Sequence, residues 1–285
     1  MESWRLLDTG VGSGARNMAV DDALARLMAA GAGEPVLRLF AWDPPAISFG
    51  YGQDPARQVD LERCARAGVD LVRRPTGGRA VLHWEELTYS VICPDSHPRL
   101  GGPVEETYRS IGECLVAGLR RLGVNASLER VSGPSGTSHQ QRVTAPCFSS
   151  TARWEIKCRG RKLIGSAQRR LDGVILQHGS LLLGPAHRRL PELLAGLSED
   201  GRRQWVGTLQ EHSVELGECL CGPPDVRRLS TCLVEGFEER LEARLHPECL
   251  TPAEEELAWQ LQREVYGNPL GPRPRRPATV RCPAP

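Results

Sequence analysis

Apolar residues recur along this chain at two spacings, and each spacing predicts a different kind of element. Near the N-terminus they lie three or four residues apart, which places them on one face of a helix that Gly31 would end: Val20, Leu24, Leu27 and Met28. The same spacing predicts further helices over residues 104–122, 187–197, 225–245 and 252–265. The last of these begins with Thr251-Pro252-Ala253-Glu254, a capping box with proline at the first helical position.

Shorter runs, which are apolar or alternate between apolar and polar residues, predict strands. They cover residues 36–40, 46–49, 70–73, 87–93, 154–158, 163–166 and 174–183. Strands and helices follow one another irregularly, which favours an α+β fold with a mixed sheet and flanking helices over a doubly wound parallel sheet. Two segments differ from this pattern: residues 132–146 are polar and predict a loop, and residues 271–285 are rich in proline and arginine and predict a disordered tail.

The charge of the chain is nearly balanced, with 36 basic and 35 acidic residues among 285 and a formal net charge of +1. This balance gives no general electrostatic attraction to nucleic acid or to an anionic membrane. No apolar run approaches the roughly 18 residues of a membrane span, and the N-terminus lacks the basic and apolar regions of a signal peptide. We therefore expect a cytoplasmic protein that binds neither nucleic acid nor membrane.

The ten cysteines do not form a metal-binding pattern. There is no CxxC pair, and the closest two, Cys219 and Cys221, have no second pair or nearby histidine cluster to complete a zinc site. A disulfide framework is not expected either, because the chain is neither short nor evidently secreted. Most of the cysteines are therefore interpreted as small packing residues.

Three short motifs contain residues suited to chemistry. The first, RRPTGGRAVLH at residues 73–83, has paired glycines, Gly77 and Gly78, whose backbone N–H groups can approach a ligand closely. Its arginines suit an anionic or carbonyl-bearing group: Arg73, Arg74 and Arg79. A tight hairpin turn with solvated arginines explains the same residues about as well, so this motif alone is a weak signal.

The second motif, GRKLIGSAQ at residues 160–168, places Lys162 where a strand begins. The strand continues with small residues that would leave room for a ligand: Gly165, Ser166 and Ala167. On spacing alone, a hairpin lysine that faces water is the more frequent situation. The third motif, ILQHGSLL at residues 175–182, interrupts a strand with His178 and Gly179. A lone histidine in a strand is more often a hydrogen-bonded core residue than a catalyst.

In this order, the three motifs resemble those of the lipoate–protein ligase and octanoyltransferase superfamily. The resemblance covers nearly the whole chain, from WRLLDTG near the start to LTPAEEEL near the end. It implies the fold of biotin–protein ligases and class II tRNA synthetases, a mixed, largely antiparallel sheet with flanking helices. GGRAVLH followed by ELTYSV is most similar to the branch that takes octanoyl groups from a carrier protein. That branch usually has an acidic residue after the motif histidine, His83, where this chain has Trp84.

The resemblance also implies a nucleophile. In the octanoyltransferase branch, a cysteine in the loop before the lysine motif carries the acyl group as a thioester, and Cys147 and Lys162 match these two positions. A free thiol is only a few per cent thiolate at neutral pH. We therefore expect the Lys162 ammonium to lower the thiol pKa and later to stabilise the oxyanion of the tetrahedral intermediate. Cys219 and Cys221 are competing candidates, but no lysine motif accompanies them.

The three motifs together give the expected substrate site. We expect the acyl chain between the Gly77-Gly78 turn and the segment 165–167, with His178 and Gly179 at the floor of the site. The residues expected to bind substrate are Arg73, Arg74, Gly77, Gly78, Arg79, His83, Gly165, Ser166, Ala167, His178 and Gly179.

The implied activity is octanoyl transfer from acyl carrier protein to a lysine of a lipoyl-carrier protein (H protein or lipoyl domain) in lipoate biosynthesis, without a cofactor. Two enzymatic alternatives are an ATP-dependent lipoate–protein ligase, which would need ATP and Mg, and an amidotransferase between carrier proteins; a third is a non-catalytic binding protein. A third glycine would favour the ligase, but Arg79 stands there. We expect a catalytic domain over residues 1–250, a C-terminal capping helix over 251–270 and the tail over 271–285.

Overall fold

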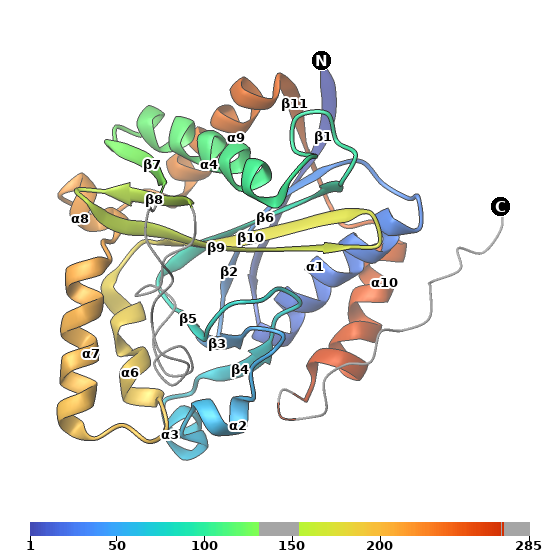
Figure 1. Cartoon of the computed structure of the whole chain (residues 1–285). Helices are drawn as coiled ribbons and strands as arrows, with labels where there is room; N and C mark the ends of the chain where they lie inside the picture. The colour runs from blue at the N-terminus through green and yellow to red at the C-terminus, as the bar shows by residue number, and fades with distance from the viewer. Residues whose placement is uncertain (131–153, 269, 271–285) are drawn as a thin grey trace.

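An eight-stranded mixed sheet runs through the middle of the molecule (Figure 1). The computed structural model describes residues 1–130, 154–268 and 270. The strands lie in the order β11 (Ala243–Glu248), β1 (Glu2–Gly12), β2 (Val36–Trp42), β6 (Glu86–Pro94), β10 (Val174–Leu182), β9 (Arg161–Leu171), β8 (Trp154–Cys158) and β7 (Ala126–Arg130). In this sheet β1 pairs in parallel with β11 and β2, and the other neighbouring strands are antiparallel. The expected mixed, largely antiparallel sheet is confirmed.

A smaller sheet holds the first motif. Its strands lie in the order β4 (Asp70–Arg73), β3 (Ala46–Phe49) and β5 (Val81–His83). The motif at residues 73–83 therefore spans the end of β4, a loop with the paired glycines, and β5. Two short helices, α2 (Pro55–Gln58) and α3 (Leu61–Arg66), connect β3 to β4. The 3-10 helix η2 (Pro185–Arg189) and α6 (Leu190–Leu193) come much later in the chain, and Leu190 and Leu193 share an apolar cluster with residues of the small sheet.

Helices cover both faces of the large sheet. Helices α4 (Val104–Arg121) and α9 (Val226–Leu241) lie on one face, and α1 (Gly14–Ala29) and α10 (Pro252–Leu261) lie on the other (Figure 1). Along β6, Tyr89 and Val91 belong to the apolar cluster beneath α4 and α9. The alternate residues Thr88 and Ser90 are polar and buried, and they point to the α1 side. The α1 side of the central strands therefore carries buried polar groups as well as apolar ones.

The C-terminal half differs from the sequence prediction in several of its helices. The helix predicted over residues 225–245 ends at Leu241, because Glu242 adopts a left-handed conformation with φ of 50° and β11 then pairs with the distant strand β1. The helix predicted over residues 187–197 is only the short pair η2 and α6. Helix α7 (Glu199–His212) was not predicted, because it buries only Leu209 and so has little apolar periodicity. Helix α8 (Leu216–Leu220) follows it.

The predicted start of the last helix is confirmed. Thr251 accepts a hydrogen bond from the backbone of Glu254, whose carboxylate accepts one from the backbone of Thr251, and Pro252 occupies the first turn of α10. A single π-helical turn (Gln262–Tyr266) follows, and the Tyr266 hydroxyl donates to Asp22 of α1 at 3.0 Å. The C-terminal helix is thereby fixed against α1. Residues 271–285 lie outside the described residues.

A buried ion pair joins α1 to the sheet. Arg38 of β2 and Asp21 of α1 lie 2.7 Å apart, and their side chains are 1% and 0% exposed. Arg38 also donates to the side chain and the backbone carbonyl of Asn17. Burial disfavours the charged form of Asp21, but Arg38 and His178 together lower the pKa of this carboxyl below its ordinary value. Loss of one partner would leave a buried charge unpaired, which typically costs about 3–5 kcal/mol.

Helices α4 and α9 approach each other backbone to backbone, which gives a first prediction. A Cβ atom on Gly236 would lie 2.4 Å from the backbone nitrogen of Gly118 and 2.6 Å from the carbonyl oxygen of Cys114. Gly236→Ala should therefore lower the free energy of unfolding by about 2–3 kcal/mol in urea titrations. Gly207→Ala in α7 is the matched control: nothing lies within 4 Å of its Cβ position, and it should stabilise by about 0.5–1 kcal/mol. Similar effects of the two changes would contradict this packing.

Three buried histidines predict loss of stability in mild acid. Burial is the main cause that lowers the pKa of His97, His178 and His187, to about 4 for His187. An unfolded histidine has a pKa of about 6.5, so below that pH the unfolded chain binds more protons than the folded one. The free energy of unfolding should fall between about pH 6.5 and pH 5, by up to about 1.4 kcal/mol per pH unit for each histidine.

Thermal unfolding of His187→Gln across this pH range checks the assignment. Because the glutamine does not titrate, the variant should lose less stability than the wild type as pH falls. His212→Gln is the control, since His212 is exposed at the end of α7. A wild-type midpoint that stays constant from pH 7 to pH 5 would contradict the prediction.

Candidate active site

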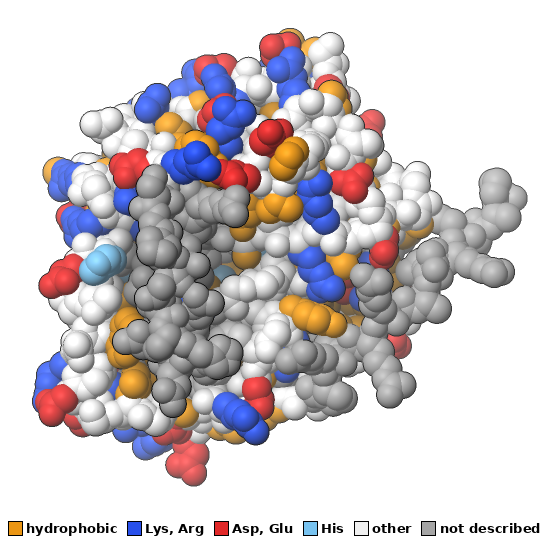
Figure 2. Space-filling model, in the orientation of Figure 1, with side chains coloured by type: hydrophobic (Ala, Val, Ile, Leu, Met, Phe, Trp, Pro, Cys, Tyr) orange, Lys and Arg blue, Asp and Glu red, His pale blue; other side chains and the backbone are white. Residues whose placement is uncertain are grey.

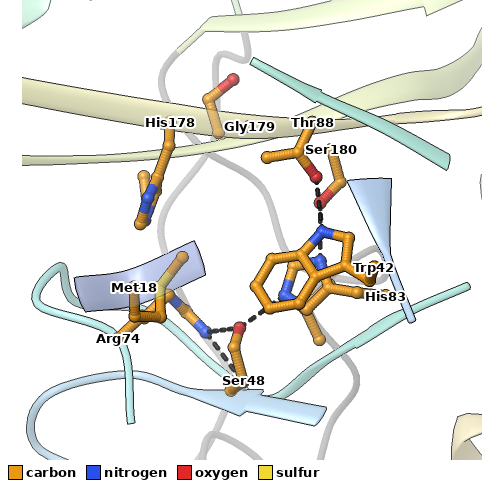
Figure 3. Close-up of a pocket in the computed structure, with 13 residues that line it drawn as sticks. Met18, Trp42, Ser48, Arg74, His83, Thr88, His178, Gly179 and Ser180 are labelled. Carbon is orange, nitrogen blue, oxygen red and sulfur yellow. Dashed lines mark hydrogen bonds between the residues drawn. The ribbon is translucent and has the colours of Figure 1, made fainter. Parts of the chain in front are cut away.

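A cavity lies between the large sheet, the small sheet and α1 (Figure 3). It has about 430 Å³ of empty space, including its opening to solvent. The side chains of Met18 and Trp42 line it, together with residues from β9, β10 and the small sheet. Gly165 pairs with Ser180 across β9 and β10, so both residues face the cavity on the α1 side. The cavity therefore lies on the face of the sheet that carries the buried polar groups.

The structure brings the three sequence motifs together around this one cavity. Its lining includes seven of the predicted substrate residues: Arg74, His83, Gly165, Ser166, Ala167, His178 and Gly179. Four others do not line it: Arg73, Gly77, Gly78 and Arg79. The lining residues that the sequence did not single out are Met18, Trp42, Ser48, Val81, Thr88 and Ser180. Val81 and Ser180 lie within two of the motifs, and the other four come from four further elements, so no spacing rule relates the six to one another.

Arg74 holds the glycine turn in place. Its guanidinium is buried and donates to the carbonyl oxygens of Ser48 at 2.9 Å, Gly77 at 2.7 Å and Arg79 at 2.8 Å. Gly78 has a φ of 102°, which favours glycine. The expectation of solvated arginines in this turn is therefore wrong for Arg74. Arg73 likewise donates to the carbonyl oxygen of Gln53.

His178 has protein partners at both ring nitrogens. Its Nδ1 lies 3.0 Å from Asp21 and its Nε2 lies 2.7 Å from the Thr76 hydroxyl. Burial lowers the pKa of His178, so the ring is neutral near pH 7. Because the Asp21 carboxylate can only accept, we assign the proton to Nδ1, and Nε2 then accepts from Thr76. His178 is thus a hydrogen-bonded buried residue that fixes the glycine loop against β10.

On the cavity wall, His83 belongs to a group of side chains that stack on and hydrogen-bond to one another (Figure 3). Its ring stacks on Trp42 with the ring centroids 3.9 Å apart, and its nitrogens lie 2.7 Å from Glu86 and 2.7 Å from Ser48. The Trp42 indole donates to Thr88 at 2.7 Å, and the Thr88 hydroxyl donates to Glu86 at 2.6 Å. The tryptophan is therefore fixed by contacts on its face and its edge.

Glu86 supplies a carboxylate to His83 although Trp84 stands directly after the histidine. Trp84 instead packs with the small sheet, and the Arg189 guanidinium lies 4.6 Å from the centre of its ring. Glu85, with a φ of 52°, makes the turn that brings Glu86 back to His83. No residue pattern could have predicted this contact, because it depends on the left-handed turn at Glu85.

A β-bulge turns Lys162 toward the cavity side of the sheet. In a regular strand, Lys162 and Ile164 would share a face. Ile164 pairs with Ile156, but Lys162 pairs with Lys157, so Leu163 is an extra residue between the two pairs. Ile156 and Lys157 are consecutive and point to opposite faces of β8, which turns Lys162 away from the face of Ile164. Lys162 is only 5% exposed, so the alternative of a hairpin lysine that faces water is wrong.

A second, smaller cavity lies on the α4 side of the sheet. It has about 310 Å³ of empty space and is lined by residues such as Leu115, Leu128 and Tyr89, and Lys162 also borders it. The Tyr89 ring occupies the space beside Gly179, where a Cβ atom would lie only 2.6 Å from the ring. Packing of this tyrosine therefore requires Gly179 to be glycine, and Gly179 lines the first cavity without a side chain.

Of the three candidate nucleophilic cysteines, the structure describes Cys219 and Cys221. Cys147, the expected nucleophile, lies outside the described residues. Of its competitors, Cys219 is half-buried, and burial, together with the neighbouring Cys158 thiol, raises its pKa. The Cys221 sulfur accepts from Arg159 at 3.6 Å. Neither competitor belongs to the described lining of the first cavity.

No group of three or more His, Cys, Asp or Glu side chains in the described parts of the chain is arranged to hold a metal ion. Within the same residues, no helix is both long enough and apolar enough to cross a lipid bilayer.

Comparison with known proteins gives consistent matches. A family model described as "Lipoyl protein ligase A/B catalytic domain" matches residues 13–238. The chain is 46% identical over 272 residues to the octanoyltransferase LipM of Kyrpidia tusciae, covering 94% of this chain and 98% of that protein. It is 40% identical over 253 residues to LipM of Moorella thermoacetica, with 89% and 92% covered.

Solved structures share the fold. The bipartite lipoate protein ligase of Thermoplasma acidophilum superposes with a TM-score of 0.79 at 23% identity and covers 97% of this chain and 99% of that chain. A lipoate-protein ligase A bound with ATP gives a TM-score of 0.73 at 25% identity, with 94% and 97% covered. The family match and the near full-length relatives agree with the three motifs around the cavity, and the chain therefore belongs to the lipoyl protein ligase A/B catalytic domain family.

Proposed function

We propose that this protein is an octanoyltransferase of lipoate biosynthesis, which moves an octanoyl group from acyl carrier protein to a lysine of a lipoyl-carrier protein. The observation that carries the proposal is the 46% identity to an octanoyltransferase over 94% of this chain. The cavity supports it, because seven motif residues from distant segments line one space. The acceptor would be a lipoyl domain or the H protein, and the protein would act in the cytoplasm.

The first cavity suits an acyl chain. Apolar groups of Met18, Trp42 and Val81 face it. The two histidine rings on its walls are hydrogen-bonded to other protein groups rather than directed into the space. His178 bonds to Thr76 and Asp21, and His83 bonds to Glu86 and Ser48. Burial of each methylene contributes roughly 0.8 kcal/mol, so an eight-carbon chain would bind mainly through this term.

The proposed reaction has two steps, a thioester exchange that acylates the enzyme and an aminolysis of the resulting enzyme thioester. The Cys147 thiolate attacks the carbonyl carbon of the octanoyl thioester, and the thiol of the carrier leaves, which forms an enzyme thioester. The amine of the acceptor lysine then attacks the same carbon, an amide forms, and the Cys147 thiolate leaves. The first exchange is nearly isoenergetic and the amide lies downhill, so neither step needs ATP. The role of Cys147 comes from the sequence motif.

Lys162 has a defined part in these steps. The bulge in β9 turns it to the face of the sheet that carries the first cavity, and it lies at the start of the strand. Its ammonium would favour the Cys147 thiolate and stabilise the oxyanion of each tetrahedral intermediate. An ATP-dependent ligase would instead direct this charge to an acyl-adenylate. Arg79 at the position of the third glycine favours the transferase.

The first test of this function uses the wild type and Cys147→Ser with octanoyl-acyl carrier protein, in the absence of ATP. Intact mass spectrometry of the wild type should show one added octanoyl group, and hydroxylamine should remove it because it is a thioester. Cys147→Ser should show no such adduct and should lose transfer to a lipoyl domain. Full transfer by this variant would contradict Cys147 as the nucleophile, and transfer that requires ATP would favour the ligase.

The second test concerns chain length. Gly165 faces the cavity, so Gly165→Leu should fill part of it and reduce transfer of octanoyl more strongly than transfer of butanoyl. The neighbouring change Ile164→Leu conserves volume on the opposite face of β9 and should leave the preference unchanged. The measurement is the ratio of the rates for the two chain lengths. A ratio that is the same in Gly165→Leu and the wild type would place the acyl chain elsewhere.

A further inference from the structure

Glu155 of β8 is a buried carboxylate in contact with Lys162. One of its oxygens lies 3.2 Å from the Lys162 Nζ atom, and both side chains are 6% exposed. Glu155 and Lys157 are two residues apart on β8, so they share a face, and the bulge in β9 turns Lys162 to that same face. The contact therefore depends on the bulge, because a regular β9 would turn Lys162 to the opposite side of the sheet.

Other charges near Lys162 have carboxylate partners of their own. Lys157, directly opposite Lys162, pairs with Glu129 at 3.0 Å, and the neighbouring Arg161 pairs with Glu218. Behind Ser213, whose backbone bridges to Lys162, His187 is neutral, because burial lowers its pKa to about 4. Among the described residues, the contact between Glu155 and Lys162 thus stands beside two other lysine–glutamate or arginine–glutamate contacts around the start of β9.

An isolated ammonium at this depth would favour its neutral form, since burial disfavours charge. A carboxylate at 3.2 Å opposes that tendency, and it also restricts a side chain that has four rotatable bonds. The proposed reaction requires both effects: a charged Lys162 and a fixed place for the charge.

We propose that Glu155 is a positioning residue for octanoyl transfer, which keeps the Lys162 ammonium charged and holds it on the cavity side of the sheet. This inference rests on the proposed function and adds a residue that none of the three motifs contains. Glu155 acts through Lys162 and does not itself touch the acyl group.

The variant Glu155→Gln tests the role of the charge. The amide keeps the size of the side chain but no longer balances the ammonium. The single-turnover rate of acyl-enzyme formation should fall by roughly 10- to 100-fold. The pH profile of the remaining activity should also differ from that of the wild type, because a carboxylate no longer lies beside the ammonium. Glu155→Asp keeps the charge at shorter reach and should recover part of the rate without the change in pH profile.

Two controls separate this role from a structural one. Glu129→Gln makes the same change in the carboxylate that pairs with Lys157, and it should leave the rate and the pH profile at wild-type values. In a Lys162→Gln background, Glu155→Gln should cause no further loss of rate, because its effect passes through the lysine.

The experiment distinguishes a failure of the Glu155 role from a failure of the proposed octanoyl transfer. The rate is measured by intact mass spectrometry with octanoyl-acyl carrier protein from about pH 6 to about pH 9, and thermal unfolding confirms that each variant is folded. The positioning role is wrong if Glu155→Gln retains the wild-type rate and pH profile. It is also wrong if Glu155→Gln reduces the rate by the same factor in the Lys162→Gln background as it does in the wild-type background. If the wild type itself forms no acyl-enzyme, the proposed function fails and this inference fails with it.

Discussion

The buried chain of contacts from Arg38 through Asp21 and His178 to Thr76 fixes the geometry of the cavity. It joins β2, α1, β10 and the loop that holds the paired glycines, over contacts of 2.7 Å, 3.0 Å and 2.7 Å. Each member is almost completely buried, so each depends on the next for the hydrogen bonds that water would otherwise supply. The cavity exists because these contacts keep α1 and the glycine loop at fixed positions on the sheet.

The two faces of the sheet have different roles. On the α4 side, residues such as Tyr89 and Val91 form a continuous apolar core. On the α1 side, the alternate residues of the same strands include buried polar groups such as Thr88 and Ser90 as well as apolar ones such as Ile92, and the cavity lies there. The bulge at Leu163 adds Lys162 to this second face. A one-residue irregularity in β9 thus decides whether the lysine lies with the cavity or with the core.

Local sequence patterns predicted some features well and others not at all. The spacing of apolar residues predicted α4, and the capping box predicted the start of α10, because both signals lie within a few turns of one helix. The three motifs predicted residues that the fold brings to one cavity. The pattern could not show that β11 pairs with β1, since that pairing joins residues about 240 positions apart.

The missed site residues share one physical reason. Glu155 reaches Lys162 through the bulge, and Glu86 reaches His83 through a left-handed turn, so both contacts depend on backbone geometry that no residue spacing reveals. Met18 and Trp42 were visible as apolar residues, but their place on the cavity wall depends on how α1 and β2 pack. Cys147 lies outside the described residues, so its role as the nucleophile stays a prediction.

The central claim is that the cavity on the α1 side of the sheet holds the acyl chain. The most direct measurement uses an octanoyl-acyl carrier protein whose chain ends in a photoreactive diazirine, followed by irradiation and peptide mapping of the labelled enzyme. We expect labels at Met18, Trp42 or Val81, which line that cavity. Labels at Leu115 or Leu128, which line the smaller cavity beneath α4, would contradict it.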